Sequence, residues 1–138
     1  MNLSVLASIF SSYPEQERFV LADSNLLPLY PDLEKELNVL APDRVLTIVG
    51  TEKAKNIDFI GKIWKFLLSH NATRHSGLIC VGGGVISDMG GFAAATYKRG
   101  IAYVNVPTTL LAMVDASVGG KTAIDFPDES GVVLKNSV

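Results

Sequence analysis

The 138-residue sequence contains one cysteine, Cys80, and only two histidines, His70 and His75. A single cysteine excludes an internal disulfide framework and a cysteine-based zinc knuckle. Two histidines are too few for a three-histidine metal site. We therefore expect no metal-ligating residues in this chain, and we expect a protein that does not depend on disulfides for its stability.

Excess charge of one sign is also lacking, because 12 Lys and Arg stand against 14 Asp and Glu. Nucleic-acid-binding domains are typically basic, so we expect no nucleic-acid partner. No apolar run approaches the roughly 20 residues that cross a bilayer. The apolar start, residues 1–12, has no basic residue ahead of it, unlike a signal peptide. These absences predict a cytoplasmic protein without membrane contact.

The chain has 48% hydrophobic and 19% charged residues, enough for one domain with a sizeable core. Short apolar runs alternate with segments in which apolar residues recur at helical spacing. The expected strands are 18–22, 44–49, 78–81 and 101–106, and the expected helices follow Pro31, cover 56–69 and begin near residue 85. This alternation predicts an α/β fold with a parallel sheet covered on both faces. The turn-rich end suggests that residues 1–138 form one domain that is incomplete at its C-terminal end.

Three consecutive glycines, Gly82, Gly83 and Gly84, separate an expected strand from an expected helix. Glycine lets backbone approach a ligand closely, and free N–H groups at a helix start attract phosphate. Ser87 occupies a position where the usual dinucleotide fingerprint has glycine. Asp88 falls in the first helical turn, where it could accept an N–H from a carboxamide. We favour a nucleotide site here over the alternative, a tight strand–helix turn with a helix-start aspartate.

The segment from Asp115 to Thr122 ends in Gly-Lys-Thr, as a P-loop does. Asp115 replaces the first glycine of that motif, and the following Ala-Ile-Asp-Phe-Pro cannot form the required helix. A P-loop NTPase is therefore the weaker interpretation. We expect Gly119 and Gly120 to bring backbone close to an anionic substrate that Lys121 binds, with Asp115 accepting its hydroxyls. The alternative is a glycine turn with a surface salt pair.

Glu52 and Lys55 follow the strand that ends at Gly50. Acidic residues at strand ends of such sheets often hold ribose hydroxyls. An exposed pair of opposite charges explains the two residues equally well. Arg99, taken alone, is typical of a surface residue, and Cys80 of an inert core thiol.

Two long segments together resemble 3-dehydroquinate synthase: GGGVISDMGGFAAATYKRG at 82–100 and VPTTLLAMVDASVGGKT at 106–122. The resemblance implies a Rossmann-like NAD-binding domain followed by a helical, metal-bearing domain, in a cytoplasmic homodimer. That family converts 3-deoxy-D-arabino-heptulosonate 7-phosphate to 3-dehydroquinate and phosphate, with NAD regenerated in each cycle. Zinc or cobalt polarises the substrate's oxygens in that family, and its ligands, a glutamate and two histidines, lie further along than this chain extends.

The resemblance also implies roles for individual residues. Those expected to bind NAD are Gly83, Gly84 and Val85 at the pyrophosphate, Asp88 at the nicotinamide end, Thr108 and Thr109, Glu52 and Lys55 near the adenosine, Asp23 and Asn25 after the first strand, and Lys135. Those expected to bind substrate are Asp115 and Lys121, which would also be catalytic, Asn136, and Arg99 from the neighbouring subunit.

One departure concerns a Lys-Asn pair that the family places nine residues after the lysine of Gly-Gly-Lys. Ser130 and Gly131 stand at that position, and the pair Lys135-Asn136 occurs five residues later. If these are the equivalents, the connecting loop is longer here. The sequence thus indicates the cofactor-binding part of such a synthase, inactive alone. The alternatives are a related cyclase of the inosose or valiolone type, and a non-catalytic nucleotide-binding module.

Overall fold

A computed structural model describes residues 3–108 and 122–138. Its elements in chain order are α1 (Leu3–Ser11), β1 (Arg18–Asp23), α2 (Leu33–Leu40), β2 (Val45–Ile48), α3 (Ile57–Ser69), β3 (Gly77–Gly82), α4 (Gly84–Thr96), β4 (Ala102–Pro107), β5 (Phe126–Pro127) and β6 (Val133–Leu134). The four strands and the three helices expected from the apolar pattern are confirmed, with bounds that differ by one or two residues.

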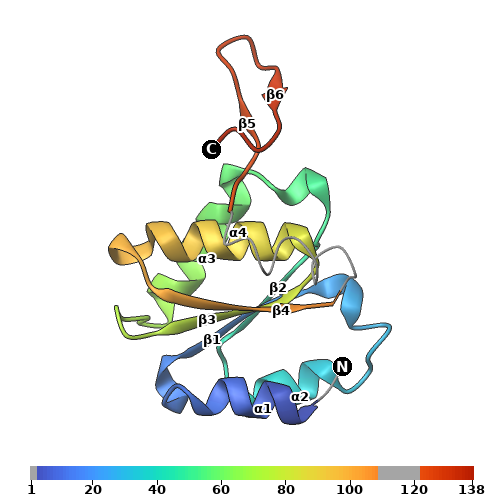
Figure 1. The fold of residues 1–138 in the computed structure, drawn as a ribbon, viewed down its shortest axis with the longest axis vertical. Helices are drawn as coiled ribbons and strands as arrows, with labels where there is room; N and C mark the ends of the chain where they lie inside the picture. The colour runs from blue at the N-terminus through green and yellow to red at the C-terminus, as the bar shows by residue number, and fades with distance from the viewer. Residues whose placement is uncertain (1–2, 109–121) are drawn as a thin grey trace.

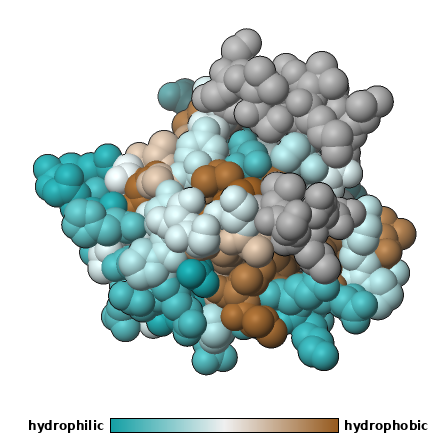
Figure 2. Space-filling view, turned by 60° about the horizontal axis from the view of Figure 1, so that its bottom comes forward, coloured by the Kyte–Doolittle hydropathy of each residue, from teal (hydrophilic) through white to brown (hydrophobic). Residues whose placement is uncertain are grey.

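The main sheet has the order β2-β1-β3-β4, and all of its neighbouring strands are parallel. Helices α3 and α4 cover one face, and α1 and α2 cover the other (Figure 1). The sheet is therefore covered on both faces, as the apolar strands predict. Figure 2 shows the α1 and α2 side, with hydrophilic side chains on both flanks and a hydrophobic strip between them.

The central strands are continuously apolar because their alternate residues enter two different cores. Phe19 and Leu21 of β1 belong to the cluster under α3 and α4, whereas Val20 and Ala22 belong to the cluster under α1 and α2. Since side chains alternate across a strand, a sheet buried on both faces needs apolar residues at every position. The parallel pairing of these strands brings their carboxyl ends to one edge of the sheet, and the polar side chains that follow the strands lie at that edge.

Helix α4 lies unusually close to β3 because it presents glycine to the sheet. A Cβ atom at Gly90 would overlap the Cys80 sulfur and would lie 3.4 Å from the Leu21 side chain. Cys80 is fully buried in the core, as expected, and this burial raises the pKa of its thiol to about 12. The close approach places the start of α4 directly after the end of β3.

The C-terminal segment differs from the sequence-based expectation of turns alone. Strands β5 and β6 pair antiparallel, Phe126 opposite Leu134 and Pro127 opposite Val133, in a hairpin that projects from the domain (Figure 1). Two-residue strands are too short for hydrophobic periodicity to reveal them. In the described part of the chain, no helix has the length and apolar character needed to span a bilayer.

Replacing Gly90 by alanine tests the close packing of α4 on β3. We expect Gly90→Ala to lower the free energy of unfolding by about 1–3 kcal/mol, because the added methyl group overpacks the core. Cys80→Ala should recover part of this loss in the double variant, since it removes the overlapping sulfur. Gly61→Ala on α3 is the matched control: its Cβ meets nothing within 4 Å, so it should stabilise. Equal free energies of unfolding for Gly90→Ala and Gly61→Ala, measured by denaturant unfolding, would contradict this packing.

Candidate functional site

The carboxyl edge of the sheet opens between β1 and β3. The chain leaves β1 towards α2 on one face, whereas it leaves β3 into α4 on the other face (Figure 1). In open α/β sheets, ligands bind in the crevice formed where successive connections diverge in this way. The candidate site therefore lies beside Asp23 and Gly82, the last residues of these two strands.

The glycine segment forms the strand-to-helix turn at this crevice. Gly83 is the N-cap of α4 and provides no side-chain cap, so the first N–H groups of the helix lack that partner. The backbone N–H of Thr108 donates to the Gly82 carbonyl at 3.0 Å, which fixes the end of β4 alongside. The hydroxyl oxygens of Ser87 and Thr108 are buried without a hydrogen-bond partner among the described residues. An uncapped 13-residue helix with unpaired hydroxyls beside it suits an anionic, hydrogen-bonding ligand.

Gly82 also has a purely structural reason to be glycine. A Cβ atom there would lie 2.7 Å from Cγ1 and 2.8 Å from Cβ of Ile86. The tight turn and the uncapped helix start are thus two consequences of the same backbone path.

A buried ion pair lies on α4 one turn further along. The Lys55 ammonium is 2.7 Å from Asp88 Oδ2, and the two side chains are only 5% and 23% exposed. Lys55 also donates to the Asn136 amide oxygen. It sits directly after the short 3₁₀ turn Glu52–Ala54, which carries it from the end of β2 towards α4. A buried cation is tolerated only when such partners replace its water.

Asp125 joins the C-terminal hairpin to this cluster. Its N–H donates to the Lys55 carbonyl at 2.9 Å, its Oδ1 accepts from the Asn136 N–H at 2.8 Å, and its Oδ2 accepts from Lys135 Nζ at 3.1 Å. The hydrogen bond from Asn136 holds the pKa of Asp125 below its ordinary value, burial opposes this, and Lys135 adds to the lowering. Lys135 is 3.9 Å from Glu52 Oε2 as well. Asp125 therefore contacts Lys55, Lys135 and Asn136 at the same time.

The structure brings together several of the residues predicted from the sequence. Contacts or neighbouring helix positions connect Glu52, Lys55, Gly83, Gly84, Val85, Asp88, Thr108, Lys135 and Asn136 at the carboxyl edge. Asn136 of the Lys135-Asn136 pair bonds to Lys55, and Lys135 bonds to Asp125, whereas Ser130, at the usual spacing, bonds to Asp128 in the hairpin tip. Val85 is partly buried and packs against the hydrophobic cluster under α3 and α4.

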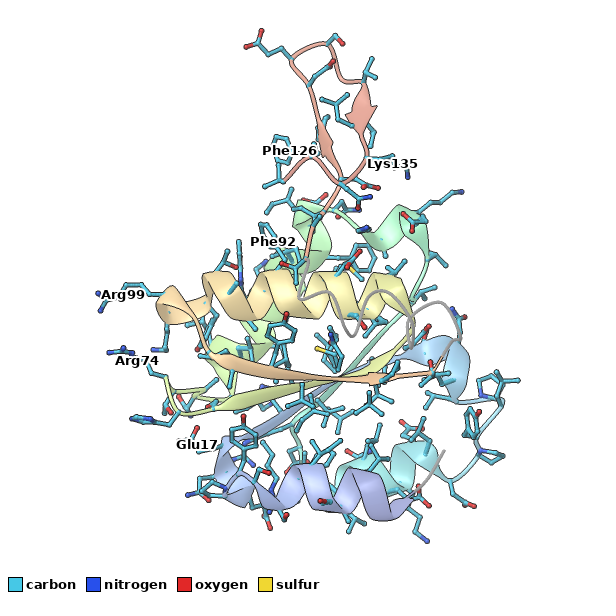
Figure 3. All side chains as sticks on the ribbon, viewed as in Figure 1. Glu17, Arg74, Phe92, Arg99, Phe126 and Lys135 are labelled. Carbon is cyan, nitrogen blue, oxygen red and sulfur yellow. The ribbon has the colours of Figure 1, made fainter. Side chains whose placement is uncertain are left out.

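Among the other predicted residues, Asp23 lies at the carboxyl edge but has a structural role there, and Arg99 lies at the opposite edge. The Asp23 carboxylate accepts N–H groups from Asn25 at 2.9 Å and Gly50 at 3.0 Å, so it fastens the ends of β1 and β2. The side chain of Asn25 is exposed. Arg99 lies between α4 and β4, at the opposite, amino edge of the sheet from Lys135 (Figure 3). Thr109, Asp115 and Lys121 lie outside the described residues.

Asp125 was not predicted from the sequence. Its neighbours in sequence, Ile124 and Phe126, give no sign of a binding site, and its partners lie 10 or more residues away. In the described part of the chain, no group of three His, Cys, Asp or Glu side chains is arranged to hold a metal ion.

Solved structures with this fold define the class. One is 2-deoxy-scyllo-inosose synthase complexed with carbaglucose-6-phosphate, NAD+ and Co2+, with a TM-score of 0.73 and 31% identity, covering 97% of this chain and 36% of that chain. Another is the 2-epi-5-epi-valiolone synthase from Streptomyces hygroscopicus with NAD+ and Zn2+ bound. It has a TM-score of 0.73 and 28% identity, and the match covers 88% of this chain and 33% of that chain. A glycerol dehydrogenase from Schizosaccharomyces pombe shares the fold at a TM-score of 0.61 and 19% identity, covering 96% and 31%. The fold is the one that these two sugar-phosphate cyclases have.

Within that class, residues 45–136 match the 3-dehydroquinate synthase N-terminal family, and the chain belongs to this family. It is 49% identical over 110 residues to 3-dehydroquinate synthase of Acidithiobacillus ferrooxidans, covering 78% of this chain and 30% of that protein. It is 41% identical over 135 residues to that of Parabacteroides distasonis, covering 98% and 37%. The chain thus spans about a third of the length of these relatives.

The pKa of Asp125 predicts an acid-sensitive contact. Folding lowers this pKa. The ionised carboxylate therefore stabilises the fold fully at pH values above the pKa of Asp125 in the unfolded chain, ~3.9. That stabilisation is lost as the pH falls through the lower pKa that Asp125 has in the folded protein. Asp125→Asn should therefore lower Tm at pH 7, and its difference from wild type should shrink below about pH 4.

Thermal melts between pH 7 and pH 3 check this expectation. Asp32→Asn is the matched control, because Asp32 is exposed and makes no side-chain capping bond. A Tm difference for Asp125→Asn that stays constant across this range would contradict the assigned contact.

Proposed function

We propose that this chain supplies the cofactor-binding part of a 3-dehydroquinate synthase, which converts 3-deoxy-D-arabino-heptulosonate 7-phosphate to 3-dehydroquinate and phosphate. The observation that carries the proposal is the Lys55–Asp88 pair beside the uncapped start of α4, in a chain that belongs to this family. The full reaction belongs to a longer protein, in which other segments supply the remaining groups.

NAD+ is the nucleotide that the site would hold. Its pyrophosphate would lie against the first N–H groups of α4, at Gly83, Gly84 and Val85, where the helix dipole favours negative charge. The unpaired hydroxyls of Ser87 and Thr108 support a polar ligand at this position. Bound NAD+ would supply a hydride acceptor that is restored within each turnover.

The carboxylates have separate tasks in this proposal. Asp88, on α4, would accept the carboxamide N–H of the nicotinamide, and Glu52 would accept ribose hydroxyls at the adenosine end. A carboxylate near a pyrophosphate is unfavourable unless its charge is compensated. The Lys55 ammonium, 2.7 Å from Asp88, provides this compensation, and Lys135 does so more weakly for Glu52 at 3.9 Å.

Substrate binding would involve residues at and beyond this cluster. We propose Asp115 and Lys121 as the substrate-binding and catalytic groups, on the sequence match alone, with Asn136 beside them. A divalent metal, Zn or Co, would be held by segments outside this chain. Its presence with NAD+ in the two related synthase structures supports this part of the proposal.

We further propose that the protein acts as a cytoplasmic homodimer in which Arg99 reaches the substrate of the neighbouring subunit. Its place at the amino edge supports a role between subunits, because the carboxyl-edge site of its own chain lies across the sheet (Figure 3).

A second candidate is a related cyclase that acts on a hexose phosphate. The observation that favours it is the 31% identity and 97% coverage of this chain with the inosose synthase structure. Phosphate release by the intact protein separates the two candidates: turnover of 3-deoxy-D-arabino-heptulosonate 7-phosphate supports the first, and turnover of glucose 6-phosphate alone supports the second.

Asp88→Asn tests the cofactor role in the intact protein. It removes a charge-assisted acceptor, so we expect the KM for NAD+ to rise roughly 10- to 100-fold in the phosphate-release assay. Glu34→Gln, on the exposed face of α2, is the control and should behave as wild type. Unchanged NAD+ dependence in Asp88→Asn would remove Asp88 from the site.

A further inference from the structure

Three buried oxygen atoms without a hydrogen-bond partner lie between α4 and β4. Among the described residues, four buried side-chain N or O atoms lack a partner, and three of them are Ser87 Oγ, Asn105 Oδ1 and Thr108 Oγ1. The fourth, on Arg44, precedes β2 at the amino edge of the sheet. Native proteins keep few such atoms, because each is costly to bury. We call the three at the carboxyl edge the oxygen cluster, and their concentration there indicates a ligand that completes them.

The strand places Asn105 on the face of the sheet that α4 covers. The parallel partner of Asn105 in β3 is Cys80, whose sulfur lies under Gly90 of α4. Side chains alternate along a strand, and the next residue, Val106, packs on the opposite cluster under α1 and α2. The Asn105 amide is therefore directed between the sheet and α4.

Ser87 reaches the same place from the helix. One turn further along α4, a Cβ atom at Gly91 would lie 3.2 Å from the Tyr103 ring of β4. Helix α4 runs antiparallel to β4, since it starts at the carboxyl edge and a backbone hydrogen bond joins its last turn to the residue before β4. From the Gly91–Tyr103 contact towards the carboxyl edge, four helix residues and two strand residues each span roughly 6 Å. Ser87 therefore lies next to Asn105.

Thr108 completes the oxygen cluster beside the glycine turn. Its N–H donates to the Gly82 carbonyl at 3.0 Å, which holds it at the end of β3. Ser87 is only 2% exposed, and its Cα–Cβ bond tilts towards the start of α4, as in any helix. The oxygen cluster thus lies directly behind the turn at which we propose that the pyrophosphate binds.

The chemistry of the oxygen cluster selects a neutral ligand group. An amide oxygen only accepts hydrogen bonds, whereas a hydroxyl both donates and accepts them. An ionised phosphate has no proton to donate to Asn105, so it does not satisfy the cluster. A group that carries both donors and acceptors does, and ribose hydroxyls and the primary carboxamide are the groups of this kind in the nicotinamide half of NAD+.

The order of the strands places this half of the cofactor at the cluster. Glu52 and Lys55, proposed for the adenosine end, follow β2 on one side of the sheet, whereas Asn105 belongs to β4 on the other side. The glycine turn after β3 lies between them. A dinucleotide with its pyrophosphate at this turn therefore extends its nicotinamide half towards β4.

We propose that the oxygen cluster binds the nicotinamide nucleoside of NAD+, and that Asn105 and Ser87 are cofactor-binding residues. The Asn105 oxygen accepts a hydrogen bond from the carboxamide or from a ribose hydroxyl, and the hydroxyls of Ser87 and Thr108 bond to the same half of the cofactor. This inference rests on the proposed function, because it needs NAD+ at the glycine turn. Without the cofactor the three oxygens stay unpaired, so they destabilise the free protein.

Asn105→Leu in the intact protein tests the inference through two measurements that should change in opposite senses. Calorimetric titration should give a Kd for NAD+ about tenfold higher, because one hydrogen bond is lost. The Tm of the NAD+-free protein should rise by about 2–4 °C, because an unpaired buried oxygen is removed. An unchanged Kd would overturn the inference. A lower Tm would also overturn it, because it would mean that Asn105 already has a partner in the free protein.

A pair of buried serines supplies the matched control. Ser87→Ala should raise the Kd for NAD+ in the same way as Asn105→Leu. Ser76 is buried as well, but its hydroxyl donates to the Glu17 carboxylate and accepts from the Thr73 N–H at 2.8 Å. Ser76→Ala should therefore lower the Tm and leave the Kd unchanged. Equal Kd values for Ser87→Ala and Ser76→Ala would contradict a role for Ser87 in binding.

An analogue of NAD+ distinguishes the two groups that could meet Asn105. In 3-acetylpyridine adenine dinucleotide a methyl ketone replaces the carboxamide, so its N–H groups are absent. If Asn105 accepts from the carboxamide, Asn105→Leu weakens binding of NAD+ and not of the analogue. If it accepts from a ribose hydroxyl, both are weakened equally.

The same titrations separate failure of this inference from failure of the proposed function. If the wild-type intact protein does not bind NAD+, the proposed function itself is wrong. If wild type and Asn105→Leu bind NAD+ with equal affinity, only the role of the oxygen cluster is wrong.

Discussion

The Lys55 ammonium is the group at which distant parts of the chain meet. Its buried charge is balanced by Asp88 from α4 and by the Asn136 amide oxygen, while its own carbonyl accepts from Asp125. A cation without water needs all of these partners, because an unpaired buried charge costs several kcal/mol. The hairpin foot, the turn after β2 and the first turns of α4 are therefore held in one arrangement.

The crevice exists because of packing that lies beneath this cluster. Gly90 has no side chain, so α4 can lie directly against β3. Gly82 likewise lets the chain turn into α4 without a clash with the Ile86 side chain. Since α4 starts directly at the sheet edge, its uncapped first turn and the Lys55–Asp88 pair lie on the same end of the helix. Structure and proposed chemistry thus depend on the same few small residues.

The fold was largely predictable because its signals are local. Continuous apolar runs such as 18–22 indicate buried parallel strands, and helical spacing in 56–69 indicates α3. The hairpin was missed because strands of two residues show no periodicity. For the site, the glycine turn and Asp88 carry local signals, and the resemblance favoured a cofactor role for Glu52 and Lys55 over an exposed charge pair. Asp125 could not be found in this way, because its burial and partners arise only when the C-terminal segment folds back on Lys55.

The central proposal is that the nucleotide binds at the glycine turn and Asp88 rather than through the Gly-Lys-Thr motif that ends at Thr122. Competition between NAD+ and ATP with Mg2+ for the intact protein, followed by calorimetry, tests it most directly. The account predicts that NAD+ binds and displaces ATP, and that Asp88→Asn weakens NAD+ binding without creating an ATP site. Tighter binding of ATP with Mg2+, lost in Lys121→Ala and unaffected in Asp88→Asn, would contradict it.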